Sequence, residues 1–394
     1  MIRATATALT ETDTVPLDAA LGRVLAHPIH TRTQMPPFDN AAMDGYAINT
    51  NGLEGAGPWD LSLVQTLAAG DVSSEPIATR EAARTLTGAH VPDGADAVIM
   101  QEAVIANGTK VRVNKRPVPG TNIRRAGEDV ALGTKILPTG KKLRPVDIAA
   151  CAAAGHATVD VHRKLHVGIM ASGDEVRIPG TSLPFGAIWD SNTPMLQAML
   201  TRSDVDCQSV VRVADDPALV RSQFAELAAH CDVIVTTGGL SVGDRDFIKP
   251  AFTALHGQTV FSGVAMKPGK PVTFGKIGQA YWLGLPGNPM AACVAWLVFG
   301  RALVAKLTGR TDLVSPLKVV LSTDVQVSPG RVDFRPASLS DYGSEGRQTV
   351  IATQSTQSAN VAQMAACDGF VRLLSENAFI EAGTVVEFVP LDEE

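Results

Sequence analysis

The sequence has few cysteines and no pair of them at a metal-binding spacing. Its 394 residues include five scattered cysteines, which argues against both a disulfide framework and a structural zinc site. No apolar run approaches the ~20 residues that a membrane-spanning helix needs. The start, MIRATATALTETDTV, lacks the apolar core of a signal peptide. We therefore expect a protein of the reducing cytoplasm that does not contact a membrane.

The chain also lacks an excess of positive charge and has few aromatic residues. The formal net charge is −6 and aromatic residues make up 5% of the chain, which disfavours electrostatic binding to nucleic acid or acidic membranes. With 45% hydrophobic and 19% charged residues, the composition is that of a globular protein. Because the chain is too long for one ordinary core, we expect about two to four domains.

The pattern of apolar residues changes along the chain. The first segment contains a predicted helix over Val15–Ala26, with Asp18 as its cap. Short alternating runs follow up to about residue 126 and predict a β-rich module, and the small residues of Arg144–Gly155 predict a helix. From Lys164 onward, apolar strands alternate with helical segments, which predicts a doubly wound parallel sheet.

The last part of the chain again favours strands. Short runs with turn residues between them predict a small β-barrel or sandwich beyond about residue 312. The predicted fold class is therefore multidomain α/β plus β. The predicted domains are a linker domain (1–30 and 127–163), an inserted β-rich domain (31–126), an α/β domain (164–312) and a C-terminal β-barrel (313–394).

Three glycine-rich loops follow apolar runs in the predicted α/β domain. They lie in Val233–Asp246, Val264–Gly275 and Tyr281–Trp296. Ligands of open α/β sheets bind at the carboxyl ends of the strands, so the loops predict one crevice. Glycine-exposed N–H groups, two lysines and helix N-termini suit a phosphate or another oxyanion. Asp244 and Asp246 would repel such a ligand unless a divalent cation lies between them.

Seven motifs in one order resemble the molybdopterin molybdenumtransferases, the enzymes that insert molybdenum into the pterin cofactor. The resemblance covers nearly the whole chain. It implies that the α/β domain is molybdopterin-binding and related to adenylyltransferases, and that the protein is a homodimer whose active site combines domains of both subunits. The motifs are PPFDNAAMDGYA (Pro36–Ala47), LTGAHVPDGADAVIMQE (Leu86–Glu102), RRAGEDV (Arg124–Val130), ASGDEV (Ala171–Val176), TTGGLSVGDRD, MKPGKP and LPGNP.

The resemblance implies that adenylylated molybdopterin (molybdopterin-AMP) and molybdate give the molybdenum cofactor and AMP, with Mg²⁺, or alternatively Zn²⁺, as the divalent cation. By motif, the catalytic carboxylates of the α/β domain are Glu175, Asp215 and Asp246, and Glu175 and Asp246 are the metal ligands. For Asp215, a helix cap before Pro217 is an equally good interpretation. The implied partners are the adenylyltransferase of the same pathway and apo molybdenum enzymes.

The resemblance also assigns substrate-binding residues. Lys267 and Lys270, with Pro271, would supply positive charge for the molybdate dianion. A phosphate would lie against two further loops, of which the second precedes a helix N-terminus. These loops contribute Gly238, Gly239, Ser241, Gly287 and Asn288. Ser358 matches a serine of the family's terminal domain near molybdate.

Three more residues come from the predicted linker and inserted domains. By resemblance, Asp44, Thr87 and Asp129 face the pocket of the partner subunit. Taken alone, Asp44 and Gly45 would indicate only a turn.

The sequence departs from the family pattern at three positions. Gly263 replaces a basic residue, Ala291 replaces a serine, and Arg335 stands one residue earlier than the expected arginine. A shift of one residue in a strand turns a side chain to the other face, so Arg335 is the least secure molybdate ligand. Two alternatives therefore stay open: a pterin-binding paralogue with weakened molybdate handling, and a non-catalytic scaffold like the terminal domain of gephyrin.

Overall fold

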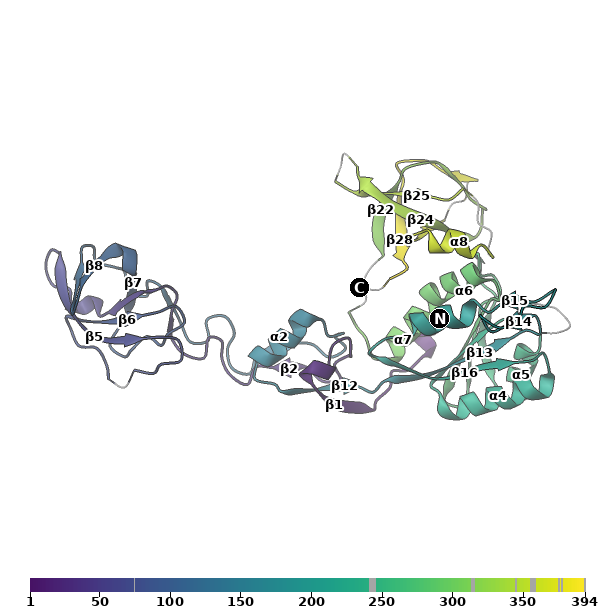
Figure 1. The fold of residues 1–394 in the computed structure, drawn as a ribbon, viewed down its shortest axis with the longest axis horizontal. Helices are drawn as coiled ribbons and strands as arrows, with labels where there is room; N and C mark the ends of the chain where they lie inside the picture. Colours follow the sequence, from purple (N-terminus) through teal and green to yellow (C-terminus); the bar gives the residue numbers. More distant parts are fainter. Residues whose placement is uncertain are drawn as a thin grey trace. The chain divides into compact units, whose positions relative to one another are not determined.

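The computed structural model describes residues 1–73, 75–240, 246–312, 316–343, 346–354, 359–374, 376 and 378–392. The chain divides into two compact units, coloured along the sequence in Figure 1. The second unit is inserted between parts of the first, because the chain leaves the first unit after His27 and returns to stay at Val159. The first unit contains Met1–His27, Thr139–Pro145 and Val159–Glu394, and the second contains Pro28–Pro138 and Val146–Thr158.

A six-stranded sheet forms the centre of the second unit. Its strand order is β7-β4-β6-β5-β9-β8, and only β5 and β6 are parallel among these neighbours. The alternating runs of the sequence explain the sheet, since in β9 Val111 and Val113 are buried while Lys110 and Arg112 are exposed. The strands are β4 (Gly45–Ile48), β5 (Trp59–Leu67), β6 (Glu81–Thr85), β7 (Ala97–Met100), β8 (Val104–Asn107) and β9 (Lys110–Val113).

Shorter elements complete the second unit. Two strand pairs are antiparallel, and helix α2 (Pro145–Ala153) forms where the small-residue helix is predicted. The paired strands are β3 (Asn40–Ala41) with β10 (Ile123–Arg124) and β2 (Ile29–His30) with β11 (Lys135–Leu137), and the 3₁₀ helices are η2 (Thr50–Gly52) and η3 (Gln101–Ala103).

The helix predicted over Val15–Ala26 is wrong. The structure has strand β1 (Thr12–Pro16), which pairs with β12 (Thr158–His162), and then only the 3₁₀ turn η1 (Leu17–Ala19). Gly22 has φ +74°, which ends the helical geometry. Beyond it, Val24 and Leu25 form isolated bridges with Lys142 and Val161. Tertiary pairing therefore overrides the local helical spacing.

The α/β domain is a six-stranded sheet in the order β16-β13-β17-β21-β20-β18. The first four strands are parallel, as predicted. At one edge, however, β20 pairs antiparallel with β21, and β18 pairs antiparallel with β20. The inner parallel strands β13, β17 and β21 are largely apolar because helices cover both faces, whereas the edge strand β16 carries polar residues such as Gln208 and Arg212. The strands are β13 (Leu165–Ser172), β16 (Val205–Val213), β17 (Val233–Thr237), β18 (Gln258–Ser262), β20 (Thr273–Ile277) and β21 (Ala280–Leu285).

Two hydrophobic clusters lie on opposite faces of this sheet. Leu196, Trp296 and Leu303 belong to one cluster, and Phe224 and Phe252 belong to the other. Figure 1 shows α4 and α5 on one side of the sheet and α6 and α7 on the other. The helices are α3 (Asn192–Met199), α4 (Pro217–His230), α5 (Ile248–Ala254), α6 (Pro289–Ala295) and α7 (Arg301–Leu307), with a π-helical turn, η4 (Trp296–Gly300), between the last two.

The continuous helix Pro289–Leu307 is apolar nearly all round. By length and composition it could cross a membrane, so the expectation that no apolar stretch approaches that length is wrong, but 72% of its 18-residue apolar window is buried inside the molecule. It is therefore a core helix of the α/β domain. The short helix α1 (Ile2–Thr5) packs beside it, because Ile2 and Leu307 share the same cluster.

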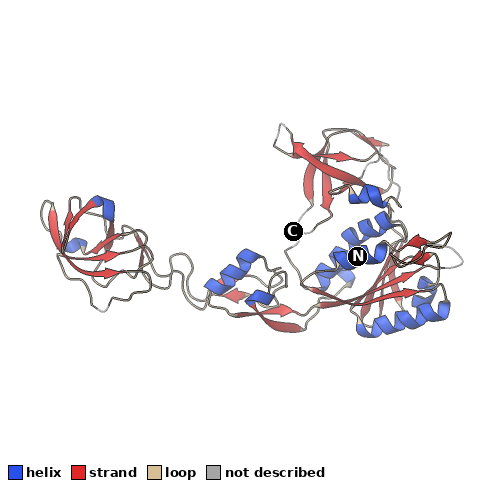
Figure 2. Ribbon diagram, in the orientation of Figure 1, coloured by secondary structure: helices blue, strands red, loops and turns tan. Residues whose placement is uncertain are grey.

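The C-terminal region is a closed five-stranded barrel. Its order is β24-β25-β22-β28-β26, and pairing of β26 with β24 closes it. The strands are drawn red in Figure 2, with the short helix α8 (Val361–Ala365) in blue. The barrel strands are β22 (Leu317–Leu321), β24 (Val332–Tyr342), β25 (Gln348–Ala352), β26 (Gly369–Leu373) and β28 (Val385–Pro390), and β23 (Val325–Gln326) pairs with β27 (Phe379–Ile380).

The barrel is joined to the α/β domain in two ways. Phe334 and Phe370 of the barrel pack in one buried cluster with Met290 and Cys293 of α6. In addition, strand β19 (Met266–Lys267) leaves the α/β domain to pair in parallel with β24. The barrel therefore holds one of the glycine-rich loops directly.

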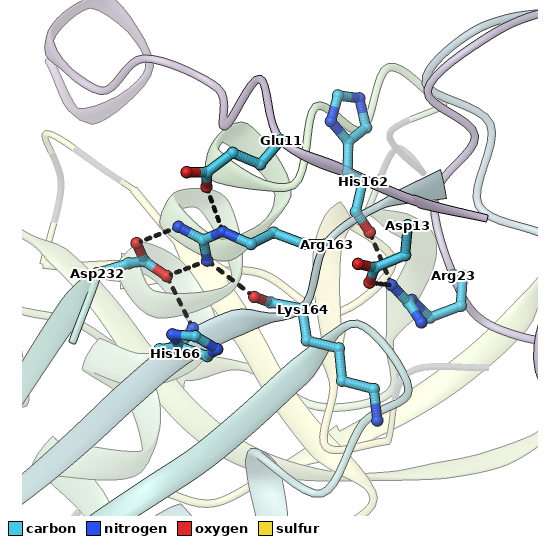
Figure 3. A network of polar contacts seen from close by, with 8 residues as sticks. All are labelled: Glu11, Asp13, Arg23, His162, Arg163, Lys164, His166 and Asp232. Atoms are coloured by element: carbon cyan, nitrogen blue, oxygen red, sulfur yellow. Dashed lines mark hydrogen bonds and ion pairs between the residues drawn. The ribbon is translucent and has the colours of Figure 1, made fainter. Parts of the chain in front are cut away.

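A charged network lies at the amino ends of β13 and β17 (Figure 3). The Arg163 guanidinium donates to both carboxylate oxygens of Asp232, at 2.7 and 2.8 Å, and also to Glu11. Burial alone would raise the pKa of Asp232, but hydrogen bonds from Arg163 and from the His166 N–H, together with the Arg163 charge, hold it below its usual value. The network fixes the N-terminal segment at the end of the sheet opposite to the glycine-rich loops.

Candidate active site

A cavity of about 790 Å³ lies at the carboxyl ends of β13, β17 and β21. The strand order makes this place a topological switch point, since β16 lies on one side of β13 and β17 on the other. The three glycine-rich loops predicted to meet do meet here. Together with residues 171–175 at the end of β13, they contribute residues 237–240, 267–271 and 286–288 to the cavity wall.

The loop after β17 requires glycine at two successive positions. Gly238 and Gly239 have φ +85° and +61°, a region that other residues rarely adopt. A Cβ at Gly238 would lie 2.5 Å from the Ser172 carbonyl oxygen, and one at Gly239 would lie 2.7 Å from Ile248 Cγ1. The loop can therefore pass close to the end of β13 only with these glycines. Ser241 lies outside the described residues.

Both predicted lysines line the cavity. Lys267 is half-buried, Lys270 is exposed, and Pro271 follows them in the wall. Lys267 pairs with Asp333 in the β19–β24 ladder, and the Val264 N–H donates to the Lys270 carbonyl oxygen at 2.9 Å. The loop is thus tied at both lysines, and it supplies two positive charges to one side of the cavity.

The predicted carboxylates Glu175, Asp215 and Asp246 also line the cavity. Asp215 is not the cap of α4, because Asp216 accepts the N–H groups of Ala218 and Leu219. The Asp215 carboxylate instead accepts the Asp174 N–H at 3.3 Å, and the Asp174 carboxylate accepts the Asp215 N–H at 3.1 Å. This reciprocal pair joins the ends of β13 and β16.

The carboxylates fit a hard divalent cation. In the described part of the chain, no group of three His, Cys, Asp or Glu side chains lies close enough to hold a metal ion alone. Mg²⁺ usually binds through one or two carboxylates together with substrate phosphates, whereas Zn²⁺ prefers His and Cys. Among the described residues of the cavity wall, none is His or Cys. Glu175 and Asp246 therefore suit Mg²⁺ better than Zn²⁺.

Five polar residues of the cavity wall were not predicted as site residues. They are Ser172, Asp174, Asp190, Asn192 and Thr237. Asp190 accepts the Thr193 N–H at 2.9 Å and the Arg212 Nε–H at 2.7 Å. These two hydrogen bonds fix the start of α3 against the end of β16. For Asp190 and Asn192 the only local signal is the polar run DSN after an apolar pair, and that pattern alone indicates a helix start.

Two further predicted residues, Gly287 and Asn288, lie in the cavity wall just before α6. Of the three departures from the family pattern, Ala291 is also in the wall, so a methyl group stands there in place of a hydroxyl. Gly263 has φ +83°, which disfavours a longer side chain at that position.

The remaining predicted residues lie elsewhere. Asp44, Thr87 and Asp129 belong to the second unit. Both the N–H and the hydroxyl of Thr87 donate to Asp44 Oδ1 at 2.7 Å, and these hydrogen bonds lower the pKa of Asp44. Asp129 is exposed, and its N–H donates to the Met35 carbonyl oxygen. The structure therefore brings Asp44 and Thr87 together.

Arg335 points into the barrel rather than toward the described wall of the cavity. It is 4% exposed, and its guanidinium donates to Asp333 at 2.8 Å and to the carbonyl oxygens of Gln326 and Gln354 at 2.7 and 2.6 Å. Arg335 lies two residues before the core residue Ala337 in β24, so both side chains lie on the same face of the strand and point into the barrel. Ser358 lies outside the described residues.

Three family models match consecutive parts of the chain. They are "MoeA N-terminal region (domain I and II)" over residues 1–155, "Probable molybdopterin binding domain" over residues 168–306 and "MoeA C-terminal region (domain IV)" over residues 318–391. The whole cavity wall falls within the second region. The fold and the site thus define a multidomain protein of the molybdopterin-binding class.

Relatives of known function match over nearly the whole chain. The chain is 34% identical to a molybdopterin molybdenumtransferase from Haemophilus influenzae, covering 97% of this chain and 95% of the relative. It is 33% identical to molybdopterin molybdenumtransferase 2 from Mycobacterium tuberculosis, covering 95% and 94%. A crystal structure of the molybdopterin biosynthesis moeA protein from Pyrococcus horikoshii OT3 superposes with a TM-score of 0.85 at 28% identity, covering 99% and 97%.

The chain belongs to the molybdopterin molybdenumtransferase family. It is a transferase of molybdenum cofactor biosynthesis, and the resemblance predicted from its seven motifs is confirmed. The predicted fold class is confirmed as well.

Proposed function

We propose that the enzyme inserts molybdate into adenylylated molybdopterin, which releases AMP and forms the molybdenum cofactor. The observation that carries this proposal is the composition of the cavity. Two lysines, a loop with two positive-φ glycines and five carboxylates, among them Glu175, Asp215 and Asp246, meet at the ends of parallel strands. Such a set can bind a phosphate-bearing ligand and a second oxyanion side by side.

The glycine loops and the lysines have separate parts in this proposal. Gly238 and Gly239, together with Gly287 and Asn288, lie against the phosphates of the adenylylated pterin, where the start of α6 favours negative charge. Lys267 and Lys270 face the molybdate dianion as point charges. Their loop is fixed at both lysines, so little ordering is needed when molybdate binds.

The carboxylates hold a divalent cation in the same proposal. Glu175 and Asp246 are the ligands, with Asp215 beside them in the wall. A bound Mg²⁺ would neutralise charge on the leaving phosphate when the phosphoanhydride bond is cleaved. The carboxylates would hold the cation, and the lysines of the cavity wall would reduce the repulsion between the negative substrates.

The second unit completes the site in a homodimer, by analogy with the family. Asp44, Thr87 and Asp129 would face the cavity of the other subunit. We likewise propose four domains. They are a linker domain (1–30 and 127–163), an inserted domain (31–126), the α/β domain (164–312) and the barrel (313–394). The proposed compartment is the cytoplasm, with the pathway's adenylyltransferase and apo molybdenum enzymes as partners.

The test mixes purified protein with adenylylated molybdopterin and Mg²⁺ and follows AMP with and without molybdate. Molybdate-dependent AMP release that reconstitutes an apo molybdenum enzyme is expected, and Asp246→Asn should abolish it while the fold is retained. Unchanged release by Asp246→Asn would remove that residue from the mechanism. Tight binding by the wild-type protein without release would instead support a pterin-binding paralogue, which the methyl group of Ala291 in the cavity wall favours.

A further inference from the structure

Asn192 connects two of the ligand loops through one side chain. It is the first residue of α3, it is 7% exposed and it lines the cavity. Its amide nitrogen donates to Thr237 Oγ1 and to the Gly287 carbonyl oxygen, both at 2.7 Å. Thr237 Oγ1 in turn donates to the Pro286 carbonyl oxygen at 3.3 Å. The end of β17 and the loop after β21 are thus tied to each other.

The chemistry of the partners fixes the orientation of the amide. A carbonyl oxygen can only accept a hydrogen bond, so the nitrogen of Asn192 must face Gly287. Thr237 Oγ1 uses its hydrogen for Pro286 and therefore accepts from Asn192. The amide oxygen of Asn192 finds no donor among the described residues. The two N–H groups, and not the oxygen, make these connections.

The position of these contacts connects them to ligand binding. A Cβ at Gly287 would lie 3.6 Å from Gly238 Cα, so the two glycine loops approach each other closely beside Asn192. Gly287 and Asn288 are exposed. Asp190 holds the start of α3 against β16 through Arg212, which gives Asn192 a fixed base.

We propose that Asn192 is a positioning residue that sets the separation of the Gly238–Gly239 and Gly287–Asn288 loops for binding the nucleotide phosphate. The inference rests on the proposed function, in which these loops bind adenylylated molybdopterin. A misplacement of about 1 Å can cost on the order of 10²-fold in an active site. Loss of the two N–H donors should therefore raise the dissociation constant of AMP by about 10- to 100-fold.

The test compares variants that delete or retain hydrogen bonds of this connection. Asn192→Leu keeps the size and adds no charge but deletes the donors, and Thr237→Val deletes the hydroxyl between the loops. Thr237→Ser retains that hydroxyl and should restore binding. The matched control is Thr236→Val on the same strand, because the buried Thr236 hydroxyl accepts from Trp282 Nε1 at 2.9 Å and belongs to the opposite face of the sheet.

The readouts are the AMP dissociation constant by calorimetry, the unfolding midpoint, and KM and kcat for the adenylylated pterin. Asn192→Leu and Thr237→Val should raise the dissociation constant and KM more than they lower kcat. Thr236→Val should lose stability without weaker AMP binding. Normal AMP binding by Asn192→Leu, or equal weakening by Thr236→Val, would overturn the inference.

The same experiment separates the two proposals. If the wild-type protein binds AMP but molybdate does not promote AMP release, the proposed reaction fails. The positioning role is then still decided by the dissociation constants of the variants. If the wild-type protein does not bind AMP, both proposals are overturned.

Discussion

Arg335→Leu should destabilise the C-terminal barrel because it leaves a buried carboxylate without its cation. Asp333 is fully buried and Arg335 is 4% exposed, and Nη2 lies 2.8 Å from Asp333 Oδ2. The same guanidinium satisfies the carbonyl oxygens of Gln326 and Gln354. Removing one partner of a buried ion pair costs about 3–5 kcal/mol. The cost should fall on β24 and on β26, its neighbour in the closed barrel.

Hydrogen exchange measured by mass spectrometry reports this cost locally. A loss of about 3–5 kcal/mol corresponds to exchange that is about 10²- to 10⁴-fold faster in peptides covering β24 and β26, where opening limits exchange. Arg372→Leu is the matched control, since this β26 arginine pairs with Glu387 at the surface and its side chain is 43% exposed. Such a pair contributes only about 0–1 kcal/mol. Unchanged protection in Arg335→Leu would refute the buried-pair argument.

A double variant separates the structural role of Arg335 from a role as a molybdate ligand. Asp333→Val with Arg335→Leu removes both charges, and apolar replacement of a buried pair is often neutral or stabilising. We expect it to recover the protection of β24 and the wild-type molybdate dependence of AMP release. Recovered protection with a raised molybdate requirement would instead identify Arg335 as a ligand.

Three further predictions concern the α/β domain. Lys270→Ala should raise the molybdate concentration for half-maximal AMP release by about 3- to 10-fold, because it deletes one exposed charge from a dianion site. An unaltered molybdate concentration would exclude Lys270 as a molybdate-binding residue. Asp232→Asn should lower the free energy of unfolding by about 2–3 kcal/mol at pH 7. Because the pKa of Asp232 is lowered in the folded protein, its stabilisation is present above the unfolded value of about 3.9 and is lost as pH falls through the folded value. The difference from wild type should therefore shrink below about pH 4 in denaturant titrations, and a constant difference would contradict the assignment. Gly238→Ala should weaken AMP binding by about tenfold or more through backbone strain, since its Cβ would lie 2.5 Å from a carbonyl oxygen. Gly287→Ala should fold normally, because its Cβ would lie 3.6 Å from the nearest neighbouring atom. Equal folding stability and equal AMP binding in the two variants would contradict the steric argument.

The parallel part of the α/β domain could be predicted because its signal is local. Runs such as Leu165–Ser172 and Val233–Thr237 are apolar throughout, and they are buried in the structure. The antiparallel edge was missed because β20 and β21 are joined by a short turn at Gly278, with φ +57°, between two of the glycine-rich regions. That turn is a hairpin signal, but the surrounding glycines masked it.

The candidate site was predictable where glycine, lysine and carboxylate residues follow strand ends. Asn192 was not predictable, because its partners lie 45 and 95 residues away in the sequence. A single Asn at the start of a helix is also common, so the local pattern offered a sufficient explanation. Arg335 is a different case. The one-residue shift in the sequence predicted that its side chain lies on the other face of the strand, but it did not predict that the guanidinium binds the buried Asp333.

The barrel acts on the cavity through its backbone rather than through Arg335. Lys267 is held because β19 pairs with Val332 and Asp333 at the start of β24, and the side chain of Asp333 is held in turn by Arg335. A defect in the buried pair would therefore reach the lysine loop as a loss of support for β24. This order of dependence explains why the single Arg335 variant alone cannot distinguish a ligand from a supporting residue. Restoring the barrel without the arginine separates the two roles, because support for β19 returns while the guanidinium does not.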